Sequence, residues 1–142
     1  MSYLKAFGIS HVALDFINND HEETASYIAT IHDTIQNAEL NSANKEAISP
    51  LLQALLEHKK EHFKREESSM LSVQFPTLHR HKQEHSRVIN ELTALISHWK
   101  QYQDMSALRT YMHHIFPLWL KSHSETMDHA IAEYITYHKQ SH

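Results

Sequence analysis

Four stretches of the chain repeat apolar residues at every third or fourth position, which is the spacing of one face of an α-helix. In the first stretch, Tyr27, Ile28, Ile31 and Ile35 form such a stripe. Short polar breaks separate the stretches, and the expected helices cover residues 20–38, 44–71, 76–101 and 105–138. Long amphipathic helices with short connections predict an all-α fold, an up-down-up-down antiparallel four-helix bundle.

The scarcity of turn-forming residues supports this fold class. The chain has one glycine and three prolines, too few for the many tight turns of an all-β domain. One of the prolines, Pro117, lies inside the fourth expected helix, where it should kink the helix or open a backbone hydrogen bond. A chain of 142 residues is long enough for a single domain over residues 1–142 that buries its own core.

Composition excludes several classes of function. The chain has no cysteine, so disulfides, thiolate metal sites and cysteine nucleophiles are ruled out. A formal charge of -4 leaves no basic patch for nucleic acid, and no apolar run reaches the roughly 18 residues that a membrane helix needs. The segment MSYLKAFGISHVALDF lacks the basic start and cleavage site of a signal peptide. We therefore expect a cytoplasmic protein.

Histidine is unusually frequent, with 15 residues, and its positions match the geometry of an antiparallel bundle. Two residues on antiparallel neighbours lie at the same height when they are equally distant from the connecting turn. His62 with His85, and Glu66 with His81, are both equally distant from residues 73–74, close to the turn expected at Phe75-Pro76. The other two connections extend the same layer to residues from all four helices, namely His21, His62, Glu66, His81, His85, His123 and Asp128.

The spacing inside each helix also suits metal binding. His62 and Glu66, like His81 and His85, are four residues apart and therefore lie on one helix face. His123 and Asp128 are five apart, a looser fit. A single pair of this kind is weak evidence in a chain so rich in histidine. Seven such groups in an apolar core, however, are too polar to remain unpaired, and a metal centre would satisfy all of them.

The ligand types restrict the choice of metal. Imidazole and carboxylate ligands suit iron, zinc, copper or manganese, and seven ligands exceed the four of a single zinc, so two ions are expected. No histidine follows a glutamate by three residues, which argues against the Glu-x-x-His sites of ferritin-like proteins. The other histidines, among them His11, His58 and His142, are expected to lie outside the ligand set.

Four segments carry a resemblance to a known family. They are His21, then His62-Phe63-Lys64-Arg65-Glu66-Glu67, then His81-Lys82-Gln83-Glu84-His85, and finally Trp119-Leu120-Lys121-Ser122-His123 followed by Asp128. Their order and spacing, H…HxxxE…HxxxH…HxxxxD, resembles the hemerythrins, and in particular the single-domain bacterial form. The resemblance covers nearly the whole chain after about residue 17.

The resemblance implies two non-haem iron ions with an oxo or hydroxo bridge. His81, His85 and His123 would bind one iron, and His21 and His62 the other. Glu66 and Asp128 would bridge them, which leaves one open position for O2. The resemblance further implies an apolar, dry O2 pocket beside that position, for which the expected lining residues are Phe63, Trp119, Leu120 and Thr24.

Some positions depart from the family pattern, and they keep more than one function open. Asn18 stands where the family has aspartate, and Thr24 and Ser124 replace apolar residues near the site. The first hypothesis is an O2-binding protein for storage, delivery or sensing. The second is a di-iron enzyme acting on peroxide or nitric oxide, which a more polar pocket would favour. The third is a metal-free helical interaction module, which chelation would leave unchanged.

Overall fold

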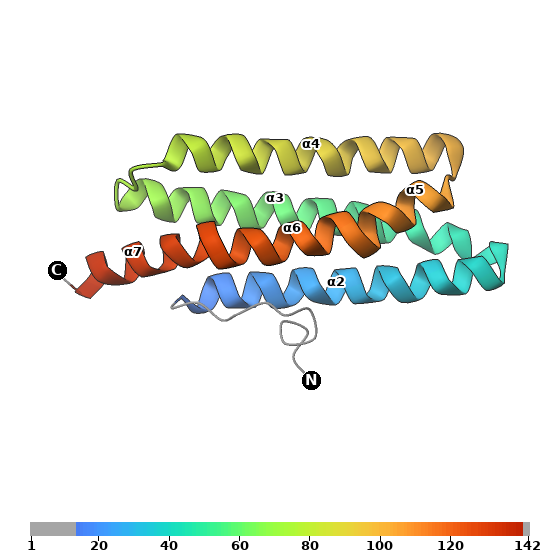
Figure 1. Cartoon of the computed structure of the whole chain (residues 1–142), viewed down its shortest axis with the longest axis horizontal. Coiled ribbons are helices and arrows are strands. Elements are labelled where there is room, and N and C mark those ends of the chain that lie inside the picture. The colour runs from blue at the N-terminus through green and yellow to red at the C-terminus, as the bar shows by residue number, and fades with distance from the viewer. Residues whose placement is uncertain (1–13, 141–142) are drawn as a thin grey trace.

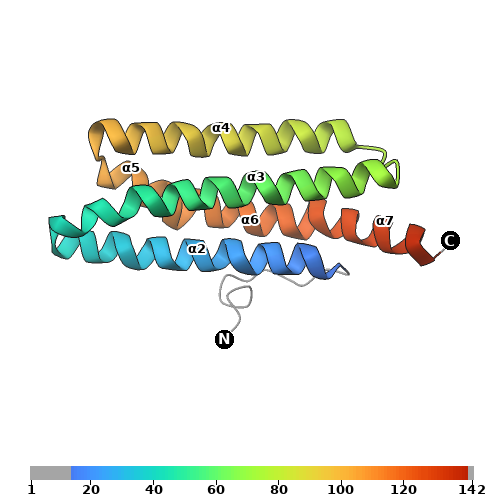
Figure 2. The same ribbon diagram turned by 180° about the vertical axis from the view of Figure 1, so that it is seen from behind.

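The computed structural model describes residues 14–140, which form an antiparallel bundle of four helical segments (Figures 1 and 2). The first segment is α2 (Asp15–Leu40), the second is η1 (Ser42–Ala47) with α3 (Ile48–Ser72), and the third is α4 (Leu78–Tyr102). The fourth segment runs through α5 (Met105–Thr110), η2 (Tyr111–Ile115), α6 (Phe116–His123), η3 (Ser124–Asp128) and α7 (His129–Gln140). The expected all-α four-helix bundle is confirmed, while His11, His142 and most of the N-terminal segment considered above lie outside the described residues.

The first and third connections are shorter than the polar composition indicated. α2 begins at Asp15 and continues to Leu40, so much of the polar stretch 37–44 is helical rather than loop. A 3-10 turn follows, and the Asn41 side chain caps it by accepting a hydrogen bond from the Ala43 N–H. At the far end of α4, Gln103 takes a left-handed conformation with φ of 47° and ends the helix. Asp104 then caps α5 by accepting a hydrogen bond from the Ala107 N–H.

The fourth segment contains two wider, π-helical turns. In the first, the Phe116 N–H bonds to the Tyr111 carbonyl five residues earlier, directly before Pro117. Proline has no N–H and its ring clashes with the carbonyl four residues before it, so a wider turn at this point accommodates the ring. In the second, the His129 N–H bonds to the Ser124 carbonyl, again five residues earlier. The helix stays continuous through both turns.

The apolar core is divided into two clusters along the bundle. The larger cluster fills one end and contains residues of every segment, including Ile31, Leu52 and Leu92, all of them fully buried. The smaller cluster, at the other end, consists of Ile17, Met70, Ile131, Ala132 and Ile135. Buried polar residues lie between the two clusters in α2, in α3 and in the fourth segment.

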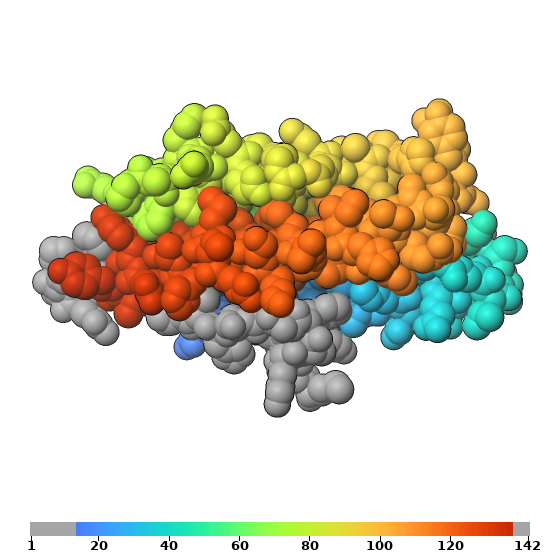
Figure 3. Space-filling model, in the orientation of Figure 1, coloured from blue at the N-terminus to red at the C-terminus, as the bar shows by residue number. Residues whose placement is uncertain are grey.

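Side chains fill the spaces between the ribbons. In the space-filling view, α4 and the segment from α5 to α7 meet along the front face (Figure 3). No helix within residues 14–140 is long and apolar enough to cross a membrane.

The larger cluster is expected to supply most of the stability of the metal-free bundle. Leu92→Ala leaves a cavity in fully buried surroundings, and we expect it to lower the free energy of unfolding by about 2–5 kcal/mol in a urea titration. Leu118→Ala is the matched control, because Leu118 is 68% exposed and its loss should change the value by less than about 0.5 kcal/mol. Equal effects of the two substitutions would contradict the location of the core.

Candidate metal centre

The structure brings together all seven side chains that the sequence analysis places in one layer. They come from all four helical segments, and each has at most 5% of its surface exposed. Their donor atoms form three groups whose members lie within 4.8 Å of one another. The groups are His21 with His62 and Asp128, Glu66 with His81 and His85, and Glu66 with His123 and Asp128.

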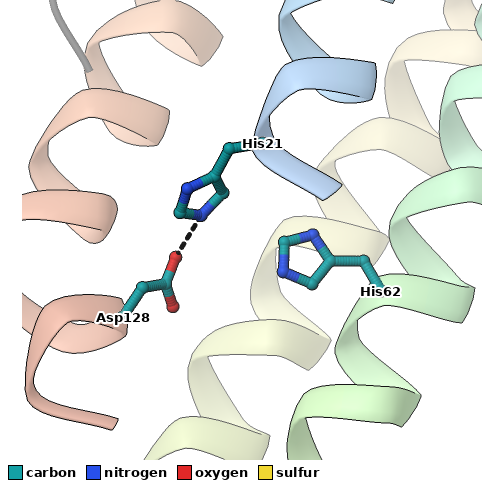
Figure 4. A group of neighbouring side chains, drawn as sticks. All are labelled: His21, His62 and Asp128. Atoms are coloured by element: carbon teal, nitrogen blue, oxygen red, sulfur yellow. Dashed lines mark hydrogen bonds and ion pairs between the residues drawn. The ribbon is translucent and has the colours of Figure 1, made fainter. Parts of the chain in front are cut away.

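One of these groups joins three helical segments (Figure 4). His21 extends from α2, His62 from α3 and Asp128 from η3, and their side chains point toward one another. His21 Nε2 lies 2.7 Å from Asp128 Oδ2, and the His21 and His62 ring centroids are 5.6 Å apart. Two imidazoles and a carboxylate oxygen thus face a common centre.

Each carboxylate connects the two halves of the site. Asp128 lies 2.7 Å from His21 Nε2 through one oxygen and 3.0 Å from His123 Nε2 through the other. Glu66 likewise lies 2.8 Å from His62 Nε2 through one oxygen and 3.3 Å from His85 Nε2 through the other. Both carboxylates therefore contact one histidine from each of the two ligand groups expected from the sequence. This is the arrangement that a pair of bridging ligands requires.

Many of these donor atoms have no hydrogen bond, although they are buried. Among the described side chains, unsatisfied atoms in this layer are Glu66 Oε1, His81 Nδ1, His85 Nε2, both ring nitrogens of His123, and Asp128 Oδ1. Leaving a buried polar atom without a partner costs about 1–3 kcal/mol. So many of them in one layer indicate a missing partner, and a cation fits, because nitrogen and carboxylate oxygen are good metal ligands.

Burial also sets the protonation states that a metal ligand needs. Burial lowers the pKa of His62 and of His81, and it lowers the pKa of His85 to about 3. These imidazoles are neutral at pH 7, so each has a free lone pair. Burial and the charge of Asp128 raise the pKa of Glu66. Burial opposes ionisation of Asp128 too, but His123 and His21 hold its pKa well below its usual range.

Neighbouring side chains fix the rings of two histidines. His85 Nδ1 lies 2.7 Å from a Glu67 carboxylate oxygen, and its ring stacks on Phe63 with centroids 4.0 Å apart. The Trp119 ring stacks on His123 at 4.7 Å, and its Nε1–H donates to Glu84 at 2.9 Å. Such partners orient a ligand ring and leave its other nitrogen facing the metal.

The four expected pocket residues lie close to this layer. Phe63 and Trp119 contact each other edge to face with ring centroids 6.2 Å apart, in addition to their stacking on histidines. Leu120 is 1% exposed and belongs to the larger apolar cluster. Thr24 is fully buried one turn after His21. Ser124 is buried as well, and its Oγ lies 3.4 Å from His21 Nδ1.

Lys59 is a residue that the sequence analysis missed. Its side chain is fully buried, and its Nζ lies 3.1 Å from His62 Nδ1 and 3.4 Å from Thr24 Oγ1. Burial lowers its pKa to about 8. Its position was a usable signal, because residue 59 continues the buried stripe of α3 between Leu55 and Phe63. The prediction of an entirely apolar pocket is therefore wrong, because its expected lining residues also contact a buried amine.

A row of polar side chains connects Lys59 with the surface. His58 Nε2 lies 3.1 Å from Thr24 Oγ1, and His58 Nδ1 lies 3.2 Å from a carboxylate oxygen of Glu23, whose side chain is 64% exposed. Asp20, Glu23 and His58 are also close enough to form a further group of possible ligands. Asp20, however, already forms an ion pair with Arg65. His58 thus belongs to the surroundings of the site and not to the central layer.

The fold and the site together define a helical-bundle metal-binding protein. The family model described as the Hemerythrin HHE cation binding domain matches residues 12–135. The chain therefore belongs to the hemerythrin family. Bacteriohemerythrin of Aquifex aeolicus (strain VF5) is 25% identical over 118 residues, which are 83% of this chain and 86% of that protein. No solved structure gives a significant match.

The low pKa of His85 predicts a loss of stability in acid. Unfolding returns this pKa from about 3 to its ordinary value of 6.5, so the unfolded state binds the extra proton first as the pH falls. Above about pH 6.5, the titration of His85 does not change the free energy of unfolding. At pH 5 it lowers the free energy of unfolding of the metal-free protein by about 2 kcal/mol.

His85→Gln removes this titration, so its loss of stability between pH 7 and pH 5 should be smaller than that of the wild type by about the same amount. Urea titrations at the two pH values measure it. His98→Gln is the control, because the His98 side chain is 42% exposed. A wild-type pH dependence in His85→Gln would show that His85 is not held neutral in the folded protein.

Proposed function

We propose that this chain binds O2 reversibly at a non-haem di-iron centre in the buried layer. The observation that carries the proposal is that each of the two buried carboxylates contacts one histidine from each half of the site. A single ion would not need two carboxylates in such positions. Two ions with two bridging carboxylates would use every donor group of the layer.

The ligand roles follow from these contacts and from the family. We assign His81, His85 and His123 to one ion, and His21 and His62 to the other. Glu66 and Asp128, each in contact with one histidine of either set, would be shared by the two ions. The first ion would then have one more protein ligand than the second, so an open coordination position would lie on the side of His21 and His62.

Iron is the metal that the comparisons favour. The donor set itself suits several metals, but the chain belongs to the hemerythrin family and is similar to a protein named Bacteriohemerythrin. Two ferrous ions, when bound, supply the electrons that O2 accepts and the open coordination position. The proposal includes a cytoplasmic location and no nucleic-acid partner, which rest on the sequence and its charge balance.

The chain's own residues would orient the ligands and exclude water. Glu67 fixes the His85 ring, Ser124 lies beside His21, and the stacked rings of Phe63 and Trp119 cover His85 and His123. With its apolar neighbours, this covering restricts access of water, which favours release of O2 without chemical loss.

A di-iron enzyme acting on peroxide or nitric oxide is the second candidate. The row from Glu23 through His58 and Thr24 to Lys59 gives the site a polar connection with the surface. A carrier with a dry apolar pocket has no need of such a row, whereas an enzyme that consumes protons does. Turnover of added peroxide by the iron-loaded protein would favour this candidate over reversible O2 binding.

A metal count and an anaerobic-to-aerobic visible spectrum test the proposal. We expect two irons per chain and a charge-transfer band that appears with O2 and disappears when O2 is removed. His62→Ala should abolish the band, because it removes a ligand from the ion with the open position. His98→Ala is the control and should keep it, since His98 is half exposed and far along α4 from the layer. No iron, or a normal band in His62→Ala, would contradict the assignment.

Leu120 tests the role of the pocket separately from metal binding. Leu120→Ala should keep both irons, because Leu120 offers no donor atom, yet its loss opens space beside the site. We expect autoxidation after O2 binding to become faster, by a factor measurable from the decay of the band. Leu118→Ala, on the exposed side of the same helix, should leave the rate unchanged. An unchanged autoxidation rate in Leu120→Ala would show that Leu120 does not line the pocket.

A further inference from the structure

A groove on the surface between α2 and α3 carries an excess of negative charge. Among the described residues that line it, Arg65 has a guanidinium group, while four have carboxylates, namely Asp20, Glu23, Glu57 and Glu61. Charges of one sign that line a cleft raise the local concentration of ions of the other sign. The groove is therefore a place where cations gather, outside the central layer.

One carboxylate of this groove has a buried oxygen without a partner. Asp20 is only 5% exposed, and its Oδ1 forms the ion pair with Arg65. Its Oδ2 is buried and has no hydrogen bond to any described residue. A buried carboxylate oxygen without a partner is unfavourable, and a cation in the groove would satisfy it. The ion pair with Arg65 thus leaves half of this carboxylate available as a ligand.

His58 and Glu23 offer two further donor atoms at the same place. His58 Nε2 faces the protein interior, 3.2 Å from the Asp20 carbonyl oxygen and 3.1 Å from Thr24 Oγ1. His58 Nδ1 lies 3.2 Å from Glu23 Oε2. Two tetrahedral ligands, each about 2.0–2.1 Å from one zinc ion, are roughly 3.3 Å apart. The nitrogen and the oxygen therefore already have the separation of two ligands of one ion.

We propose that Asp20, Glu23 and His58 form an additional cation site, which takes a divalent metal such as zinc, ferrous iron or manganese. Donor atoms of the three residues lie within 4.8 Å of one another. One imidazole and two carboxylates suit these ions, and water from the groove completes the coordination. The inference does not rest on the proposed function, because none of the three residues belongs to the central layer.

The position of this site places it between solvent and the central layer. The Glu23 side chain is 64% exposed, so an ion can reach it from outside. His58 lies one helical turn before His62 on α3, and Asp20 directly precedes His21 on α2. An ion held in the groove would be next to the two histidines that face each other in the layer.

Zinc binding to the full chain tests the site. Protein whose central layer has been saturated with iron is dialysed against increasing zinc, and the bound zinc is counted. We expect one zinc per chain beyond the layer, with a dissociation constant that rises at least about 10-fold in Glu23→Gln, because a ligand is lost.

Glu133→Gln is the matched control for Glu23→Gln. The Glu133 side chain is 65% exposed, and its Oε1 lies 2.9 Å from His129 Nε2, so it forms a similar surface pair with a histidine. Among the described residues, this pair belongs to no group of three possible ligands. The dissociation constant for zinc in Glu133→Gln should therefore stay within about twofold of the wild-type value.

His58→Gln is the second variant, and it should weaken zinc binding as much as Glu23→Gln does. Thermal unfolding of the metal-free variants checks that both are folded. An unchanged constant in either variant, an equal change in Glu133→Gln, or no zinc beyond the layer in the wild type would overturn the inference. Wild-type protein without iron would overturn the proposed function instead. The same comparison in zinc-saturated protein then tests the groove, where both variants should bind one zinc fewer than the wild type.

Discussion

The burial of five imidazoles and two carboxyl groups in one layer is the constraint on which the rest of this bundle depends. Such a layer is unstable unless every group finds a partner, and hydrogen bonds among the seven leave several atoms without one. A cation satisfies them only if all four segments keep their relative heights. The apolar clusters at both ends of the layer serve this purpose, because they hold α2, α3 and the fourth segment on either side of the polar residues.

The π turn of η3 shows how backbone geometry serves the site. In a regular α-helix, residues five apart differ in direction by roughly 140°, so His123 and Asp128 would not face one point. The turn at Ser124–Asp128 takes more residues than an α-helical one, and it brings Asp128 Oδ1 to 3.0 Å from His123 Nε2. The loose spacing seen in the sequence is therefore the spacing that a π turn requires. Single π turns of this kind occur often at functional sites.

Much of the layer was predictable, because the register of an antiparallel helix pair follows from the position of its turn. His62, Glu66, His81 and His85 needed only the turn at Phe75-Pro76 to be placed together. The π turns were predictable only in part, because Pro117 signalled a disturbed helix at η2, whereas the sequence showed only a loose His123–Asp128 spacing at η3. Lys59 was missed for another reason. Lysine is almost always exposed, and this general preference concealed the local evidence of a stripe running from Leu55 to Phe63.

Lys59 also bears on the choice between carriage and consumption of a ligand. Under the proposed function, this buried amine would be a hydrogen-bond donor beside a ligand that gains negative charge. The same amine is connected with the surface through Thr24 and His58, the polar row that the second candidate function would use. A purely apolar pocket would not stabilise a charged ligand. The amine therefore distinguishes this site from a purely apolar pocket, and the rings of Phe63 and Trp119 pack against it.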